Sequence, residues 1–439
     1  MSELLNRSEQ LALEERARAL AGVEALGEPE RAALGELVER LADTYPYGSA
    51  RYAGQMLKPP HAVARAAYAT AMALNPNKHA LDGGPATAAM EREAVAGLAA
   101  MFGFDEHLGH LSASGTIANL EALWVARELH PDGVILSALN AHYTHERMCA
   151  VIGARHATLP QDRDGRLDLD ALEARLGQGG VGTVVATLGT TGLGVVDAVD
   201  AVADLCAAYG ARLHVDAAYG GFFTLLADGL EPGVGRAPFD AVRRADSIVV
   251  DPHKHGLQPY GCGAVLFRDP GVGRLYRHDS PYTYFTSGDL HLGEISLECS
   301  RAGAAAAALW TTLRVFALER DGLGAVVGAA RAAALAFAEA AGDDLPLVVP
   351  PDLDIVCPFP RRARASEVTA ACEAAFDRLA DEGWHVAKLR VDASWLAQRH
   401  PWLEPDTDTA TVLRSVLMKP EHLPVAGALA TAMRSALER

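Results

Sequence analysis

Two short stretches of the chain carry residues whose types and positions could do chemistry. In SIVVDPHKHGLQPYGCGAVLF, an apolar run of strand type (248–250) leads to a turn that contains Lys254, and a second β-rich run (263–267) follows. A lysine at such a strand end can be desolvated, lose its proton more readily and act as a nucleophilic amine that forms a Schiff base. For this stretch alone, an ordinary solvated turn lysine is the alternative.

The second stretch, RLHVDAAYGGFF, brings Asp216 to the end of a short strand, 254 − 216 = 38 residues before Lys254. A buried aspartate is costly unless a partner stabilises its charge, and a protonated pyridine nitrogen is such a partner. A Schiff-base lysine and an aspartate on the ring nitrogen form the electron-sink arrangement of pyridoxal phosphate enzymes. The two stretches together therefore favour a pyridoxal phosphate site.

HVDAAYGG followed by DPHKHG resembles the fold-type I, pyridoxal-phosphate-dependent group II amino acid decarboxylases, which include glutamate, aromatic amino acid and tyrosine/aspartate decarboxylases. The resemblance implies decarboxylation of an L-amino acid to its amine and CO2 through a Lys254 Schiff base. It also implies a homodimer with shared active sites. Carbon–carbon (aldehyde) lysis and transamination on the same scaffold remain alternatives, and the intact Lys254 and Asp216 argue against a non-catalytic binding protein.

A turn of small residues, SASGT, opens onto a helix with an apolar face and could bind a phosphate group. Backbone N–H groups at a helix N-terminus bind anions, although Ser and Thr are also common helix caps. The resemblance implies that Ser114, Gly115 and Thr116 hold the cofactor phosphate together with His253. Asp251 stands where animal members of the family carry asparagine, and the resemblance gives it no phosphate role.

Other motifs complete the cofactor site that the resemblance implies. His142 of the AHYT motif would stack on the pyridine ring, and Ala218 would pack beneath it. Thr190 of ATLGTT would contact the cofactor unless it is only a loop cap, and Ser300 of ECSRAGA would touch the partner's phosphate. The expected cofactor-binding residues are thus Ser114, Gly115, Thr116, His142, Thr190, Asp216, Ala218, His253, Lys254 and Ser300.

A polar, aromatic segment at 278–292 is long for a connection, which indicates a functional loop. Family members place there a tyrosine that protonates the carbanion carbon. Tyr284 is the closer match and Tyr282 the alternative. The resemblance therefore implies the catalytic set Lys254, Asp216, His142 and Tyr284.

Arg414 is a candidate for substrate binding. In TVLRSVLMKPEH it alternates with apolar residues, so it would project one charge into a pocket. The planar guanidinium group of arginine can donate two parallel hydrogen bonds to one carboxylate. We expect Arg414 to bind the substrate α-carboxylate.

Pairs of histidines one helical turn apart raise the question of a metal site. His107 and His110 form one such pair, and His142 and His145 form another. Zinc sites need three or four ligands with carboxylate or thiolate help, and the sequence provides no matching set. We expect no metal, with His145 on the helix surface or behind the site.

Apolar runs of strand type alternate with helical patterns through the middle of the chain, as in a parallel sheet with helices on both faces. We expect an α/β fold of the fold-type I pyridoxal phosphate transferase architecture. Its parts would be an N-terminal helical segment (1–78), a large cofactor-binding domain (79–317) and a small C-terminal α+β domain (318–439). In the small domain, the runs 345–349, 353–356 and 385–391 are expected to be strands.

The amino-acid composition limits which partners and which cellular compartment are expected. A net charge of −17 and a pI near 5.4 argue against nucleic acid and anionic membrane as partners. Six cysteines without a CxxC pair suit reduced thiols. The N-terminus has no signal-peptide pattern, and the alanine-rich run 328–342 is too polar and short to span a bilayer. We expect a cytoplasmic enzyme whose partner is an amino acid substrate.

Overall fold

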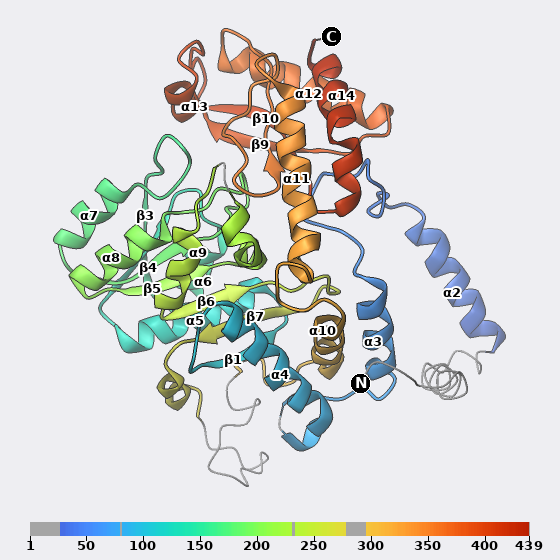
Figure 1. Cartoon of the computed structure of the whole chain (residues 1–439), viewed down its shortest axis with the longest axis vertical. Helices are drawn as coiled ribbons and strands as arrows, with labels where there is room; N and C mark the ends of the chain where they lie inside the picture. The colour runs from blue at the N-terminus through green and yellow to red at the C-terminus, as the bar shows by residue number, and fades with distance from the viewer. Residues whose placement is uncertain (1–26, 80, 231–232, 278–295, 439) are drawn as a thin grey trace.

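The computed structural model describes residues 27–79, 81–230, 233–277 and 296–438 (Figure 1). Short apolar runs form a seven-stranded sheet in the order β1-β7-β6-β5-β4-β2-β3. The strands are β1 (Leu108–Ser112), β2 (Val134–Ala138), β3 (Arg155–Leu159), β4 (Val181–Thr187), β5 (Arg212–Asp216), β6 (Ser247–Val250) and β7 (Gly263–Phe267).

The strands from β6 to β3 run parallel to one another, and β7 is antiparallel to both of its neighbours. Parallel strands need crossover connections, and helices supply them here. The predicted mostly parallel α/β sheet is confirmed. The helices on this part of the chain are α4 (Pro85–Met101), α5 (Gly115–Leu129), α6 (Thr144–Ile152), α7 (Leu169–Gly177), α8 (Val199–Tyr209) and α9 (Ala237–Ala241), with the 3-10 turns η2 (Leu81–Gly83), η3 (Gly221–Gly229), η4 (Val242–Arg244) and η5 (Pro270–Leu275).

Both faces of the sheet are buried. Ile135 and Val185 pack with residues of α5 and α6 in one cluster. Their strand neighbours Leu136 and Val184 belong to the main core together with residues of α8. Successive side chains of a strand point to opposite faces, so this division places helices on both sides of the sheet.

The C-terminal part of the chain has its own antiparallel sheet in the order β8-β10-β9. Its strands are β8 (Ile355–Val356), β9 (Ala387–Asp392) and β10 (Thr409–Val416). Residues 345–349 were predicted to form a strand, but they make only an isolated bridge from Leu347 to Pro358. Pro346 lies within this run and Pro350 follows it, and neither has an N–H to donate, which explains the missing ladder.

Helix α10 (Gly303–Val315) packs on α4 beside the large sheet. The small sheet is surrounded by α11 (Leu323–Ala341), α12 (Ala365–Asp381), α13 (Ala393–Arg399), the 3-10 turn η6 (Pro420–Val425) and α14 (Ala426–Glu438). Figure 1 shows α11 in orange, running from the C-terminal part toward the large sheet. By length and hydropathy α11 could cross a bilayer, yet its Arg331 is buried and donates to two backbone carbonyls within the protein.

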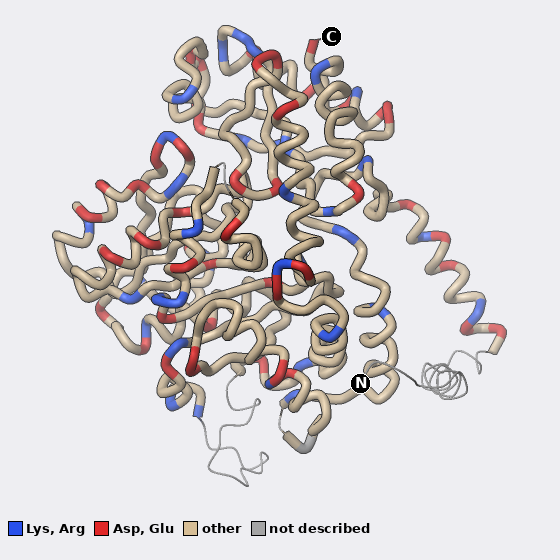
Figure 2. The backbone as a smooth tube through the Cα atoms, viewed as in Figure 1, with Lys and Arg blue, Asp and Glu red and all other residues tan. Residues whose placement is uncertain are grey.

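The N-terminal helices are arranged differently from each other. Helix α3 (Ala62–Met72) packs on α10, whereas α2 (Glu28–Leu41) projects away from the rest of the chain and has no buried residue (Figure 1). Both signs of charge occur along α2, as Figure 2 shows. The domain boundaries expected after residues 78 and 317 stay a prediction.

Candidate active site

A cavity of about 210 Å³ lies where β4, β5 and β6 end and α5 begins. Ligands of open α/β sheets bind at this carboxyl edge of the strands. The sheet therefore brings together five motifs that are far apart in the sequence. Among the predicted site residues, the cavity is lined by Ser114, Gly115, Thr116, His142, Asp216, Ala218, His253 and Lys254.

Lys254 lies in the turn that follows β6, and its ammonium group is ion-paired. Its Nζ lies 3.1 Å from Oδ2 of Asp251, whose side chain is buried. The backbone N–H of Lys254 also donates to the Asp251 carbonyl at 2.9 Å. The lysine side chain keeps 18% exposure, so it is both charge-compensated and accessible from the cavity rather than simply desolvated.

Asp216 ends β5, and both of its carboxylate oxygens accept hydrogen bonds. The Ala218 N–H donates to Oδ1 at 3.1 Å, and Nε2 of His145 bonds Oδ2 at 2.9 Å. Burial by itself would raise the pKa of Asp216, but the His145 hydrogen bond and the positive potentials of His145 and Lys254 hold this pKa below its ordinary range. Asp216 is therefore a buried anion at neutral pH, which is the state that retains a proton on a pyridine nitrogen.

Helix α5 begins at the cavity. The Oγ of Ser114 accepts the Ile117 N–H at 3.3 Å and caps the helix. A Cβ added at Gly115 would lie 2.7 Å from Oδ1 of Asp251, so only glycine fits between the helix start and this carboxylate. The free N–H groups and the dipole of the first helical turn favour an anion here.

Two histidines line the cavity, and burial lowers the pKa of both His142 and His253. The Thr144 N–H donates to Nδ1 of His142 at 3.2 Å, which leaves the ring proton on Nε2. Nδ1 of His253 donates to the Cys262 carbonyl at 2.8 Å. Each imidazole is thus an oriented, uncharged ring at neutral pH.

Three of the predicted residues do not line the cavity. Oγ1 of Thr190 accepts the Val195 N–H at 3.3 Å, as a loop cap does. The Asn77 side chain donates to Oγ of Ser300 at 3.1 Å. Arg414 on β10 is buried and donates to backbone carbonyls.

Sequence reasoning missed residues that the structure brings to the site. Thr187 and Tyr219 line the cavity. Of the two positions expected for His145, the structure shows the one behind the site, where its side chain is fully buried. Thr187 belongs to the ATLGTT motif, so its position at the end of β4 was the available signal. Tyr284 and Tyr282, the predicted proton donors, lie outside the described residues.

The cavity fits pyridoxal phosphate. It offers an amine on Lys254, a buried carboxylate on Asp216 and a helix N-terminus suited to the phosphate. Oγ1 of Thr187 is buried and has no hydrogen-bond partner among the described residues, as expected where a ligand atom completes the site. In the described parts of the chain, no group of three or more His, Cys, Asp and Glu side chains could hold a metal ion.

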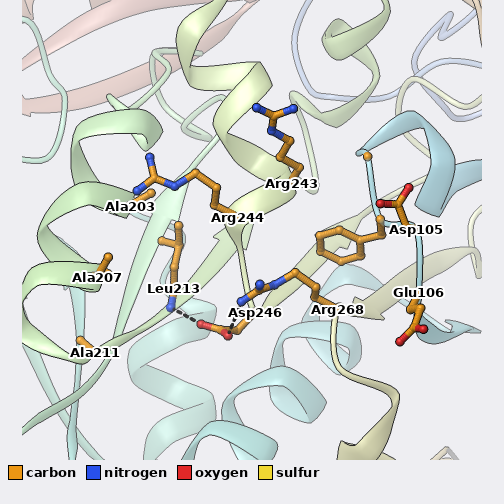
Figure 3. A pocket seen from close by; sticks show the side chains of 13 residues that line it. Asp105, Glu106, Ala203, Ala207, Ala211, Leu213, Arg243, Arg244, Asp246 and Arg268 are labelled. Carbon is orange, nitrogen blue, oxygen red and sulfur yellow. Dashed lines mark hydrogen bonds and ion pairs between the residues drawn. The ribbon is translucent and has the colours of Figure 1, made fainter.

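A larger pocket of about 760 Å³ lies at the opposite edge of the sheet, beside the first residues of β5 and β6. Figure 3 shows Arg268 reaching Asp246, which also accepts the Leu213 N–H. The lining includes no lysine or histidine, and burial raises the pKa of its Cys206 thiol to about 12. This pocket therefore offers no lysine amine that could carry a carbonyl cofactor.

Comparison with known proteins identifies the class to which this fold and site belong. Residues 62–346 match the model of the pyridoxal-dependent decarboxylase conserved domain. A probable L-aspartate decarboxylase of Halobacterium salinarum is 32% identical over 78% of this chain and 89% of its own length. An L-tyrosine decarboxylase of Enterococcus faecium is 30% identical over 70% of this chain and 66% of its own length.

The fold agrees with this class. The structure of a rice (Oryza sativa) TDC with PLP and tryptamine superposes with a TM-score of 0.80 over 99% of both chains at 20% identity. The fold and the cavity are those of a fold-type I pyridoxal phosphate enzyme. The chain belongs to the pyridoxal-dependent decarboxylase family, and it is an amino acid decarboxylase that uses pyridoxal phosphate.

The contact between Gly115 and Asp251 gives a first prediction. Gly115→Ala would push the Asp251 carboxylate away from Lys254 and distort the start of α5. We expect the dissociation constant for pyridoxal phosphate, measured by absorbance titration, to rise about tenfold or more, equivalent to about 1.4 kcal/mol. Gly177→Ala is the matched control, because no atom would lie within 4 Å of the new methyl group. Unchanged cofactor affinity in Gly115→Ala would contradict the close fit.

Proposed function

We propose that this enzyme converts an L-amino acid to its amine and CO2 in the Lys254 cavity. The observation that carries the proposal is the buried, doubly hydrogen-bonded carboxylate of Asp216 lining the same cavity as Lys254. Pyridoxal phosphate, when bound, supplies an electron sink that accepts the electrons released as CO2 leaves. Every other requirement falls on side chains of this chain.

Each of these side chains has a defined task. Lys254 would provide the amine that carries the cofactor, and Asp216 would keep a proton on the ring nitrogen. His142 would stack on the ring, and burial, which lowers its pKa, keeps the imidazole uncharged. The start of α5 would hold the phosphate. A tyrosine of the 278–292 segment, Tyr284 or Tyr282, would return a proton to the carbon that loses CO2.

The surroundings of Arg414 support its role toward the substrate α-carboxylate. Nε donates to the Gly192 carbonyl at 2.9 Å and Nη2 to the Thr191 carbonyl at 2.6 Å, while Nη1 lies 3.4 Å from the Gly54 carbonyl. All three partners of this buried guanidinium in the described part of the chain are backbone carbonyls, and none is a carboxylate. Buried charges are normally paired, and Thr191 lines the cavity. A substrate carboxylate would supply the missing negative charge.

Arg414→Met tests this role, because it removes the charge and keeps the length of the side chain. The loss of a charge-assisted contact worth about 1.5–3 kcal/mol should raise KM by about 10- to 100-fold. Cofactor loading should stay intact, and Arg414→Lys should recover part of the loss. Arg390→Met, on the exposed side of β9, is the control. A KM at the wild-type value in Arg414→Met would refute the assignment.

The relatives suggest which substrates to try first. Their names specify L-tyrosine, L-aspartate and, for one Pyrococcus horikoshii enzyme, both L-aspartate and L-glutamate. We propose that this enzyme acts on an L-amino acid from the same acidic and aromatic group. Carbon–carbon lysis and transamination are the competing reactions on this scaffold, and the family match supports decarboxylation over both.

Release of CO2 from a panel of the twenty amino acids, ornithine and diaminobutyrate, with added pyridoxal phosphate, tests the reaction and identifies the substrate. Mass spectrometry should detect CO2 and the matching amine from one substrate class. Lys254→Ala should reduce the rate at least about 10³-fold, because it removes the nucleophilic amine. If the cofactor-loaded protein released no CO2 from any amino acid of the panel, decarboxylation would be refuted, and carbon–carbon lysis or transamination would be favoured.

We also propose a homodimer. Leu34, Leu37, Val38 and Leu41 form an apolar stripe on α2, and each is at least 47% exposed. An apolar groove of about 560 Å³ lies between α3, α4 and α10, and its lining includes Val63, Leu74 and Met90. Exposed apolar surfaces of this kind mark association sites. Covering the α2 stripe with a second copy of the chain removes it from water.

Light scattering after size exclusion tests the dimer. The full chain should elute as a dimer, and Leu37→Asp with Leu41→Asp should shift it toward monomer, because two charges would enter the apolar contact. Glu36→Ala, on the polar side of α2, should leave the dimer intact. A monomeric wild type would exclude the dimer, and a dimeric double variant would exclude α2 as its contact.

The cysteines support a reducing compartment. All six that the structure contains are free, five buried and Cys299 exposed. An exposed free thiol persists in the cytosol, so we propose a cytoplasmic location. The acidic surface supports small-molecule rather than nucleic-acid partners.

A further inference from the structure

His145 is a buried histidine whose place in the site neither the sequence motifs nor the family match assigns. It is the second residue of α6, and its side chain is fully buried against the end of β5. Nε2 lies 2.9 Å from Oδ2 of Asp216. Because an ionised carboxylate only accepts, the proton between these atoms belongs to His145.

The contact with Asp216 is the polar anchor of this imidazole. Nδ1 of His145 has no hydrogen-bond partner within the described residues. The neighbouring ring of His214 lies 6.3 Å away and is held by Asn119 and Ser247, so it does not compete for Asp216. Burial also lowers the pKa of His214 to about 3, which keeps that ring uncharged.

One helical turn joins His145 to the cavity. The His145 N–H donates to the His142 carbonyl at 3.1 Å, and His142 lines the cavity. The start of α6 therefore places one imidazole in the cavity and another on the carboxylate behind it.

We propose that His145 is a positioning residue that keeps the Asp216 carboxylate ionised and oriented toward the cofactor ring. Without the Nε2–H donor, a buried Asp216 would lose one of its two hydrogen bonds and take up a proton more readily. A neutral Asp216 holds the ring nitrogen proton poorly, so the electron sink weakens. The inference rests on the proposed role of Asp216.

Cofactor affinity is the first measurement, made on the full chain by quenching of intrinsic fluorescence with pyridoxal phosphate. His145→Leu should raise the dissociation constant about tenfold or more and alter the absorbance spectrum of the bound cofactor. His145→Gln should recover most of the loss, because its amide nitrogen reaches the place of Nε2. His145→Asn is too short to reach Oδ2 and should behave like the leucine variant.

His110→Leu is the matched control. Nε2 of His110 lies 2.7 Å from Oε2 of Glu121, both side chains are buried, and neither lines the cavity. This variant should lower the melting temperature without changing cofactor affinity or spectrum per folded molecule. If His145→Leu fails to fold, cofactor affinity is compared between His145→Gln and His145→Asn instead. Tighter binding by the glutamine variant supports the proposal, and equal binding contradicts it.

A double-mutant cycle separates this inference from the function on which it rests. In the Asp216→Asn background, His145→Leu should have no further effect, because His145 acts through that carboxylate. Wild-type affinity in His145→Leu, or losses that simply add in the double variant, would overturn the proposal for His145. Wild-type affinity and CO2 release in Asp216→Asn itself would instead overturn the proposed role of Asp216.

Discussion

The site depends on keeping two carboxylates charged inside the protein. Asp216 and Asp251 are each at most 4% exposed, and a charge buried in this way is costly unless a partner compensates it. Asp216 is compensated from α6 by His145, and Asp251 is compensated by Lys254 in its own turn. These compensations require the ends of β5 and β6 and the start of α6 to lie in fixed register. The parallel sheet provides that register.

A third buried carboxylate ties the C-terminal part of the chain to the same place. The Tyr219 hydroxyl donates to Oδ1 of Asp354 at 2.5 Å, and Nε2 of His255 lies 3.2 Å from its Oδ2. Tyr219 follows Asp216 by three residues, and His255 follows Lys254 directly. Burial and the Asp354 charge raise the pKa of Tyr219, so the phenol remains a donor. Asp354, just before β8, thereby holds both segments that carry the proposed chemistry.

Local motifs predicted most of the cavity lining, because the position of a turn directly after a strand can be inferred from the neighbouring residues alone. The motifs that end β4, β5 and β6 and that open α5 and α6 each brought at least one residue to the lining, whereas the motif that opens α10 did not. Contacts set by tertiary packing were not predictable in this way. Thr187 rather than Thr190 lines the cavity, since β4 ends at Thr187 while the loop beyond it folds back on Val195. His145 has the spacing of an ordinary helix residue, and only the approach of α6 to β5 gives it a partner.

The charges around the cavity also constrain how a substrate can bind. Asp216 and Asp251 contribute two negative charges to the lining, Lys254 contributes one positive charge, and burial keeps His142 and His253 uncharged. A substrate carboxylate placed beside this excess of negative charge would be repelled. The buried Arg414 lies behind the loop at Thr191, where its partners among the described residues are backbone carbonyls. If Arg414 binds the substrate α-carboxylate as proposed, that carboxylate would lie on the side of the small sheet, away from Asp216 and Asp251.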